Sequence, residues 1–100
     1  MKEINIENFE ENVKKDGYVI IDFWAPWCGP CRMQGLILED FEENHDNVTV
    51  YKVNVDEEGA LAQAFSIMSI PTLIYFKDGE PISKAIGVQS EEDIENALGL

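Results

Sequence analysis

The stretch that decides the fold is Trp27-Cys28-Gly29-Pro30-Cys31, which contains both cysteines of the chain. The apolar run Tyr18–Trp24 precedes it and predicts a strand covered on both faces. Met33, Ile37 and Phe41 follow it at the four-residue spacing of a helix. A C-x-x-C motif between a strand and a helix is typical of a dithiol redox site. Unpaired N–H groups and the positive dipole end at the helix start would stabilise a thiolate there.

Two segments add specificity to this motif. The run Ala25-Pro26-Trp27-Cys28-Gly29-Pro30-Cys31-Arg32-Met33 resembles the active-site signature of the thioredoxin family, and Ile70-Pro71-Thr72 resembles that family's cis-proline loop. The resemblance covers the whole chain, residues 1–100, as a single domain. It implies an α/β thioredoxin fold, in which about four helices flank a central mixed sheet of about five strands. It also implies a thiol–disulfide oxidoreductase that reduces protein disulfides through a mixed-disulfide intermediate.

Length and charge exclude several other classes of function. One hundred residues suffice for one domain with its own core. The net charge of −13, from 20 acidic and 7 basic residues, argues against nucleic-acid binding and against anionic membrane surfaces. The acidic N-terminal segment lacks the apolar region of a signal peptide, and no stretch approaches the length of a membrane span. The expected compartment is therefore the cytoplasm.

The acidic residues are unevenly distributed along the chain. None occurs in the ranges 23–38, 59–77 and 81–90, which contain the cysteine motif, the Ile70-Pro71 loop and Gly87-Val88. One explanation is that strands and core segments lack charge in any protein. The other is a neutral, partly apolar contact face on an acidic body, because the cores of interfaces are depleted in charge.

Capping patterns and alternation indicate the elements near the N-terminus. Ile4 and Ile6 alternate with polar residues and predict a short first strand, while Asn8 with Glu11 resembles the capping box of a first helix. The helix after the cysteines is predicted to end near His45. This histidine falls in a polar turn, so we interpret it as solvated.

The second half of the chain shows strand and turn signals. Predicted strands lie at Val48–Asn54, Thr72–Lys77 and Pro81–Ile86, with a short helix near residues 60–65 and an Asp78-Gly79 hairpin turn. Ser90 with Asp93 forms a capping-box pattern that opens a last helix, from which Ile94, Ala97 and Leu98 would face the sheet. The resulting order, β-α-β-α-β-α-β-β-α, is that of the thioredoxin fold.

The two cysteines are expected to have different roles. Cys28 precedes the helix, so we expect it to be the more exposed sulfur and the attacking thiolate, with the positive charge of Arg32 nearby. Cys31 would then resolve the mixed disulfide. The alternative is half of a zinc or iron–sulfur site, but that needs further ligands, and only His45 remains. We therefore expect no metal and no cofactor other than a redox-active Cys28–Cys31 disulfide.

Asp22 is an anomaly, because it places a carboxylate within an apolar strand. An unpaired buried charge is costly, so its pKa should rise. A carboxyl with a raised pKa near the cysteines could exchange a proton with Cys31 during catalysis. Lys52, on the neighbouring strand, is the candidate charge partner. The alternatives are a surface-facing aspartate at a strand end and a solvated lysine at a sheet edge.

The expected substrate site surrounds the cysteines. The resemblance implies a cis Ile70–Pro71 bond, although only about 5–6% of X–Pro bonds are cis and an ordinary proline at a strand start is the alternative. In the cis geometry the Ile70 backbone would turn outward beside Cys28, where an extended substrate could pair with it. The expected substrate-binding residues are Trp27, Gly29, Pro30, Ile70, Pro71, Gly87 and Val88.

One position departs from the family pattern. The family carries a proline that kinks the helix after the cysteines, and here the residue is Leu36, after Gly35. Leucine restores a backbone donor, so we expect a straighter helix. The resemblance further implies a monomer that a thioredoxin reductase-type electron donor recharges, and disulfide-containing proteins as substrates. The alternative function is that of a thioredoxin-like binding subunit of a larger complex.

Overall fold

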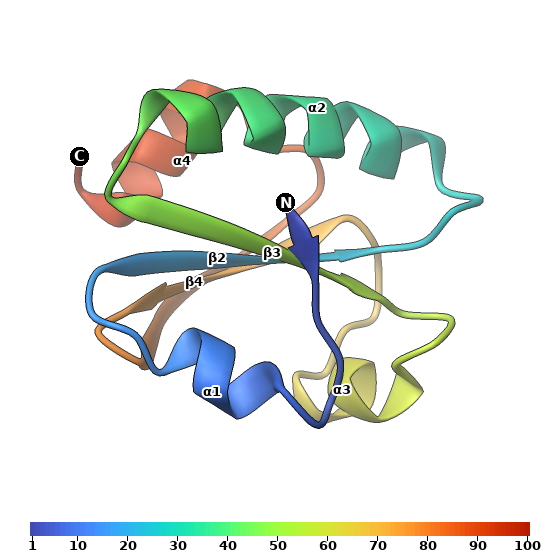
Figure 1. Ribbon diagram of the computed structural model, residues 1–100. Coiled ribbons are helices and arrows are strands. Elements are labelled where there is room, and N and C mark those ends of the chain that lie inside the picture. Colours follow the sequence, from blue (N-terminus) through green and yellow to red (C-terminus); the bar gives the residue numbers. More distant parts are fainter.

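A five-stranded sheet separates two pairs of helices in the computed structural model, which describes residues 1–100. Figure 1 shows α2 and α4 on one face of the sheet and α1 and α3 on the other. In chain order the elements are β1 (Lys2–Glu3), α1 (Phe9–Val13), β2 (Tyr18–Trp24), α2 (Gly29–Asn44), β3 (Val48–Asn54), α3 (Gly59–Ala64), β4 (Thr72–Lys77), β5 (Glu80–Ile86) and α4 (Glu91–Leu98).

The sheet is mixed, as expected, with the strand order β1-β3-β2-β4-β5. β3 pairs in parallel with both β1 and β2, whereas β4 pairs antiparallel with both β2 and β5. The β2–α2–β3 unit is a crossover connection, and it places β2 in the middle of the sheet. None of the helices is both long and apolar enough to span a bilayer.

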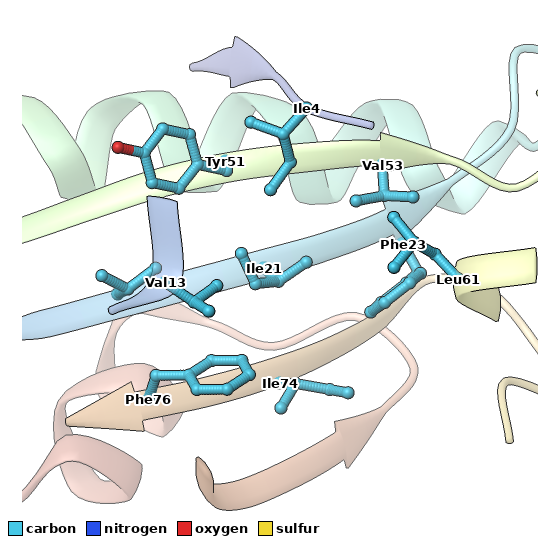
Figure 2. Close-up of a cluster of buried hydrophobic side chains, with 10 residues drawn as sticks. Ile4, Val13, Ile21, Phe23, Tyr51, Val53, Leu61, Ile74 and Phe76 are labelled. Carbon is cyan, nitrogen blue, oxygen red and sulfur yellow. The ribbon is translucent and has the colours of Figure 1, made fainter. Parts of the chain in front are cut away.

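Apolar side chains fill both faces of the sheet. On the α1 and α3 face, ten buried residues from β2, β3, β4 and the adjoining segments form one cluster (Figure 2). A second cluster of nine lies beneath α2 and α4. Because side chains alternate along a strand, Ile21 and Phe23 of β2 enter the first cluster and Ile20 enters the second. The same alternation directs Asp22 to the α2 face.

The N-terminal predictions were partly wrong. β1 lies at Lys2–Glu3, and of the two isoleucines only Ile4 is buried, whereas Ile6 is 53% exposed. The Asn8 capping box does not form, since the Asn8 side chain makes no capping hydrogen bond to α1. Instead, Asn8 Oδ1 accepts from the Asn5 amide at 2.8 Å, and Asn5 Oδ1 accepts from the Asn8 amide at 3.0 Å. This local Asx-type turn competes with capping for the same groups.

The inward face of α2 also differs from the expected one. Met33 is 59% exposed, and Gln34 takes the buried position with Leu38 and Phe41. His45 is not a solvated turn residue: its ring stacks on Phe41 at 3.8 Å, and its Nδ1 lies 2.9 Å from the Phe41 carbonyl oxygen. The unpaired carbonyl groups at the end of α2 attract this ring.

The predictions for the C-terminal part were confirmed. Asp78 and Gly79 both have positive φ, 50° and 85°, as a tight hairpin turn requires. Ser90 and Asp93 form the predicted capping box at the start of α4, with both reciprocal hydrogen bonds present. The fold therefore packs α2, which begins at the cysteines, against the sheet.

Candidate active site

The cysteine pair lies at the start of α2. Cys28 and Cys31 form a disulfide, with Cys28 as the N-cap residue and Pro30 in the first turn. The Cys31 backbone amide donates to Cys28 Sγ over 3.2 Å. The two residues are almost equally buried, at 5% and 4% exposure. The expectation that Cys28 would be clearly the more exposed cysteine is therefore wrong for the disulfide form. What distinguishes Cys28 is that a helix amide points at its sulfur, which favours the thiolate form there.

Arg32 is the positive charge closest in sequence to the cysteines. Its Nη2 atom lies 3.5 Å from the Pro26 carbonyl oxygen, so the guanidinium reaches back toward the loop between β2 and α2. A cation there adds to the field of the helix terminus.

The loop before β4 approaches the disulfide from the other side. The Ile70–Pro71 peptide bond is cis, as the resemblance implied, and the Ile70 carbonyl oxygen lies 3.9 Å from Cys28 Sγ. No backbone group of the chain pairs with the Ile70 N–H or C=O. The Gly87 amide donates to the Pro71 carbonyl over 2.8 Å, which places Gly87, at φ +89°, next to this loop. Unpaired backbone beside the reactive sulfur can accept an extended strand.

An apolar cavity of about 360 Å³, here called the front groove, adjoins this loop. Trp27 is 69% exposed at its side, and its indole N–H donates to Asp56 Oδ2 over 3.0 Å, which fixes the ring. Met68, the most exposed apolar residue at 93%, belongs to the same lining. The groove is lined by Trp27, Val55, Ala62, Ile67, Met68, Ser69 and Ile70.

Three other predicted contact residues are unobstructed or partly exposed. Gly29 has open space where a Cβ atom would lie, and so does Gly87. Val88 is 37% exposed. At the two glycines, a second backbone can therefore approach closely.

Asp22 is buried on the α2 side of β2. It is 2% exposed, and its Oδ1 atom has no hydrogen-bond partner. Burial raises the pKa of Asp22 from 3.8 to about 7, and the charge of Lys52 opposes this rise. The carboxyl therefore titrates near neutral pH, as a proton-transfer group requires.

Lys52 is opposite Asp22 in the β2–β3 register, as predicted. Its direct ion pair, however, is with Glu3 of β1, whose Oε2 lies 3.9 Å from Lys52 Nζ. The ammonium also lies 4.8 Å from the centroid of the Trp24 ring. Lys52 thus acts on Asp22 through its field and not through a hydrogen bond.

A second opening of about 370 Å³, here called the rear cleft, joins Asp22 to Cys31. It lies between the sheet and α2, on the side where Leu36 is found. Its lining is Met1, Asp22, Trp24, Cys31, Arg32, Gly35, Leu36, Glu39 and Lys52.

Sequence reasoning missed three residues of the site. Gln34 is fully buried and makes two hydrogen bonds with the Gln89 backbone, accepting from its amide at 2.6 Å and donating to its carbonyl at 3.1 Å. Asp56 holds Trp27, and Met68 lines the front groove. A polar residue at an inward helical position was the available signal for Gln34. No group of three or more His, Cys, Asp or Glu side chains is arranged to hold a metal ion.

Known proteins resemble this chain in both sequence and structure. The family model described as Thioredoxin matches residues 1–99. A thioredoxin of Alicyclobacillus acidocaldarius subsp. acidocaldarius is 52% identical over 92 residues, which cover 91% of this chain and 88% of that protein. A thioredoxin of Chlamydia pneumoniae is 41% identical over 98 residues, which cover 98% and 95%.

Solved structures give the same result. The crystal structure of oxidised mitochondrial thioredoxin 3 from Saccharomyces cerevisiae superposes with a TM-score of 0.89 at 30% sequence identity. The match covers 99% of this chain and 93% of the yeast chain.

Proposed function

The chain belongs to the thioredoxin family and is a thiol–disulfide oxidoreductase, and we propose that its reaction begins at Cys28. The observation that carries this assignment is the hydrogen bond from the Cys31 amide to Cys28 Sγ at the start of α2. Helix-terminal amides stabilise a thiolate more than a thiol, so the reduced form would carry its negative charge on Cys28.

The reaction we propose has two exchange steps. In the first, the Cys28 thiolate attacks one sulfur of a substrate disulfide, which forms a mixed disulfide and releases the other substrate sulfur as a thiolate. In the second, Cys31 loses its proton and attacks Cys28 Sγ, which releases the second substrate sulfur. Two electrons pass to the substrate, and the Cys28–Cys31 disulfide remains on the protein.

In this proposal Asp22 receives the proton that Cys31 loses. Both residues line the rear cleft, and the pKa of Asp22, about 7, suits a group that accepts and returns a proton near neutral pH. Lys52 would assist by favouring the charged carboxylate through its field. In the opposite direction, when the protein itself is reduced, Asp22 would return the proton to Cys31.

The substrate would bind across the face that contains the front groove. Its backbone would pair with the free N–H and C=O of Ile70, next to the cis bond to Pro71. Apolar side chains would contact Trp27 and Val88, while Gly29, Pro30 and Gly87 would permit close approach.

Thioredoxins work with a reductase and with disulfide-containing proteins in general. We propose that a thioredoxin reductase-type donor reduces the Cys28–Cys31 disulfide of this protein and that the protein acts as a monomer. A cytoplasmic location fits this role, because a dithiol reductant works where a donor keeps its cysteines reduced.

Selective alkylation tests the assignment of the nucleophile. The reduced protein is treated with limiting iodoacetamide near neutral pH, and the labelled residue is identified by peptide mass spectrometry. Cys28 should be modified well before Cys31, because only a thiolate reacts. Equal or reversed labelling would contradict the assignment.

A matched pair of variants tests the order of the two steps. Cys31→Ser should accumulate a covalent mixed disulfide with insulin, whose disulfides are the substrate, since the second step is lost. Cys28→Ser should accumulate none, and neither variant should sustain insulin reduction by dithiothreitol. A stable complex with Cys28→Ser instead would reverse the roles.

A further inference from the structure

The rear cleft contains polar atoms that no other group of the protein satisfies. Asp22 Oδ1 and Trp24 Nε1 are both buried without a hydrogen-bond partner, and both residues line the cleft. A buried water needs about two to four polar partners and a space far smaller than the cleft's roughly 370 Å³. The cleft thus offers water a place beside Asp22.

The rim of the cleft is apolar on one side. Leu36 lines it and is 67% exposed, so its side chain borders both the cleft and bulk solvent. The Met1 side chain lies beside it: Met1 Cε is 3.8 Å from the point that a Cβ on Gly35 would occupy. Leu36 and Met1 thus place apolar groups in the part of the lining that borders α2.

The charged groups around Asp22 come from three elements. Lys52 faces it from β3, and Glu3 of β1 is the ion partner of Lys52. Cys31, Arg32 and Glu39 line the same cleft from α2. The Met1 amine is paired with Glu42 at 3.6 Å, and the β4 residue opposite Asp22 is Leu73, which does not titrate. None of these charges lies at the position of Leu36, so a change there alters water access without removing a charge.

We infer that Leu36 is a positioning residue that limits the access of water to Asp22 and thereby controls proton exchange between the buried carboxyl and solvent. Leu36 contacts neither sulfur nor substrate in this role. It acts through the hydration of Asp22, because fewer water molecules near a carboxyl disfavour its charged form. The inference rests on the proposed use of Asp22 as the proton acceptor of Cys31.

Truncation of the rim tests the inference. In Leu36→Ala, more water should reach the carboxyl, so the pKa of Asp22 should fall by at least about half a unit, a small part of the several units that burial can produce. The titration is followed through the ¹³C carboxyl resonance of Asp22 in the oxidised protein. The acidic limb of the pH profile for disulfide exchange should shift in the same direction.

Two further variants control for effects on the helix. Met33→Ala truncates another exposed residue of α2 that does not line the cleft, and it should leave the Asp22 titration unchanged. Leu36→Met keeps an apolar side chain of similar size and should retain the value of the unmodified protein. If Leu36→Ala moves the titration no further than Met33→Ala does, the inference is wrong.

The same measurements separate this inference from the proposed function. The titration reports the hydration of Asp22 whether or not the carboxyl takes part in catalysis. The kinetics of Asp22→Asn report the catalytic role whether or not Leu36 affects hydration. A shifted titration with unaltered Asp22→Asn kinetics would therefore refute the proton role and leave the effect of Leu36 on hydration in place.

Discussion

The front groove and the rear cleft are of similar size, about 360 and 370 Å³, yet their chemistry is opposite. The front groove has an apolar lining that carries no charged side chain, whereas the rear cleft contains Asp22, Arg32, Glu39 and Lys52. The groove adjoins Ile70, whose carbonyl faces Cys28, and the cleft includes Cys31. Under the proposed function, substrate sulfur and protons would therefore reach the disulfide from separate sides.

The division follows from the alternation of side chains along β2. Even-numbered positions face α2, so a carboxylate at Asp22 falls beneath the helix that carries the cysteines. The front groove is lined mainly by the segment from α3 to the cis bond, where no acidic residue occurs, together with Trp27 and Val55. Each side can therefore be altered separately.

The largest effect is expected from Asp22→Asn, which removes the central group of the rear cleft. Because the folded-state pKa of about 7 lies above the ordinary 3.8, the folded protein holds a proton that the unfolded chain loses between these values. Stability should therefore fall as the pH rises through this window, and the penalty should be complete above it. Relative to the unmodified protein, the free energy of unfolding of Asp22→Asn should be little higher near pH 4 and up to about 4 kcal/mol higher near pH 8.

Denaturant unfolding of the oxidised protein across this pH range measures the effect on stability. Asp46→Asn, at an exposed turn, is the control and should retain the pH dependence. Disulfide exchange by Asp22→Asn should slow by roughly tenfold or more and show a simpler pH profile. Identical stability and rate profiles for Asp22→Asn and the unmodified protein would show that Asp22 neither titrates near neutral pH nor transfers the proton of Cys31.

Leu36→Pro should have the next largest effect. Proline at this position lacks the N–H donor and clashes with the Arg32 carbonyl one turn back, so α2 should bend and stability should fall by about 3 kcal/mol. The reduction potential should move as well, because the cysteines lie at the start of this helix. Crystallography, the denaturant midpoint and a redox titration measure these changes, with Leu36→Met as the unbent control. An unchanged helix axis and potential would show that leucine here is a neutral substitution.

Met68→Ala should have the smallest effect, confined to the front groove. This side chain is 93% exposed, so stability should not change. Its apolar area should be buried when a protein substrate docks, and its loss should lower kcat/KM for insulin roughly tenfold, or about 1.4 kcal/mol. Ile6→Ala, an exposed apolar residue outside the groove, should leave this rate unchanged. A similar loss with a small disulfide reagent would contradict a role in docking proteins.

Some site residues could be predicted because they depart from the residue pattern around them. A carboxylate inside an apolar strand marked Asp22, and the cysteine motif before a helix marked Cys28 and Cys31. The fold, the β4–β5 hairpin and the Ser90 cap followed from strong local signals. Such residues can be recognised because burial or backbone geometry leaves them few alternatives.

Other features depend on partners that are distant or compete locally. The ion pair between Lys52 and Glu3 forms because β1 lies beside β3 in the sheet. The distribution of charges along the sequence does not reveal that these two strands are neighbours. Asn8 does not cap α1 as predicted, because the side chains of Asn5 and Asn8 each accept a hydrogen bond from the backbone amide of the other residue. His45 was misjudged because its stacking partner lies one helical turn earlier.

Gln34 has a consequence for the proposed docking of substrates. Its two hydrogen bonds to the Gln89 backbone tie the middle of α2 to the loop that carries Gly87 and Val88. The residues proposed to contact a substrate would thereby be held in place before docking, so little conformational entropy would be lost. A rigid face of this kind cannot remould itself around individual side chains. It would select partners by an accessible disulfide in an extended segment, which many unrelated proteins can present.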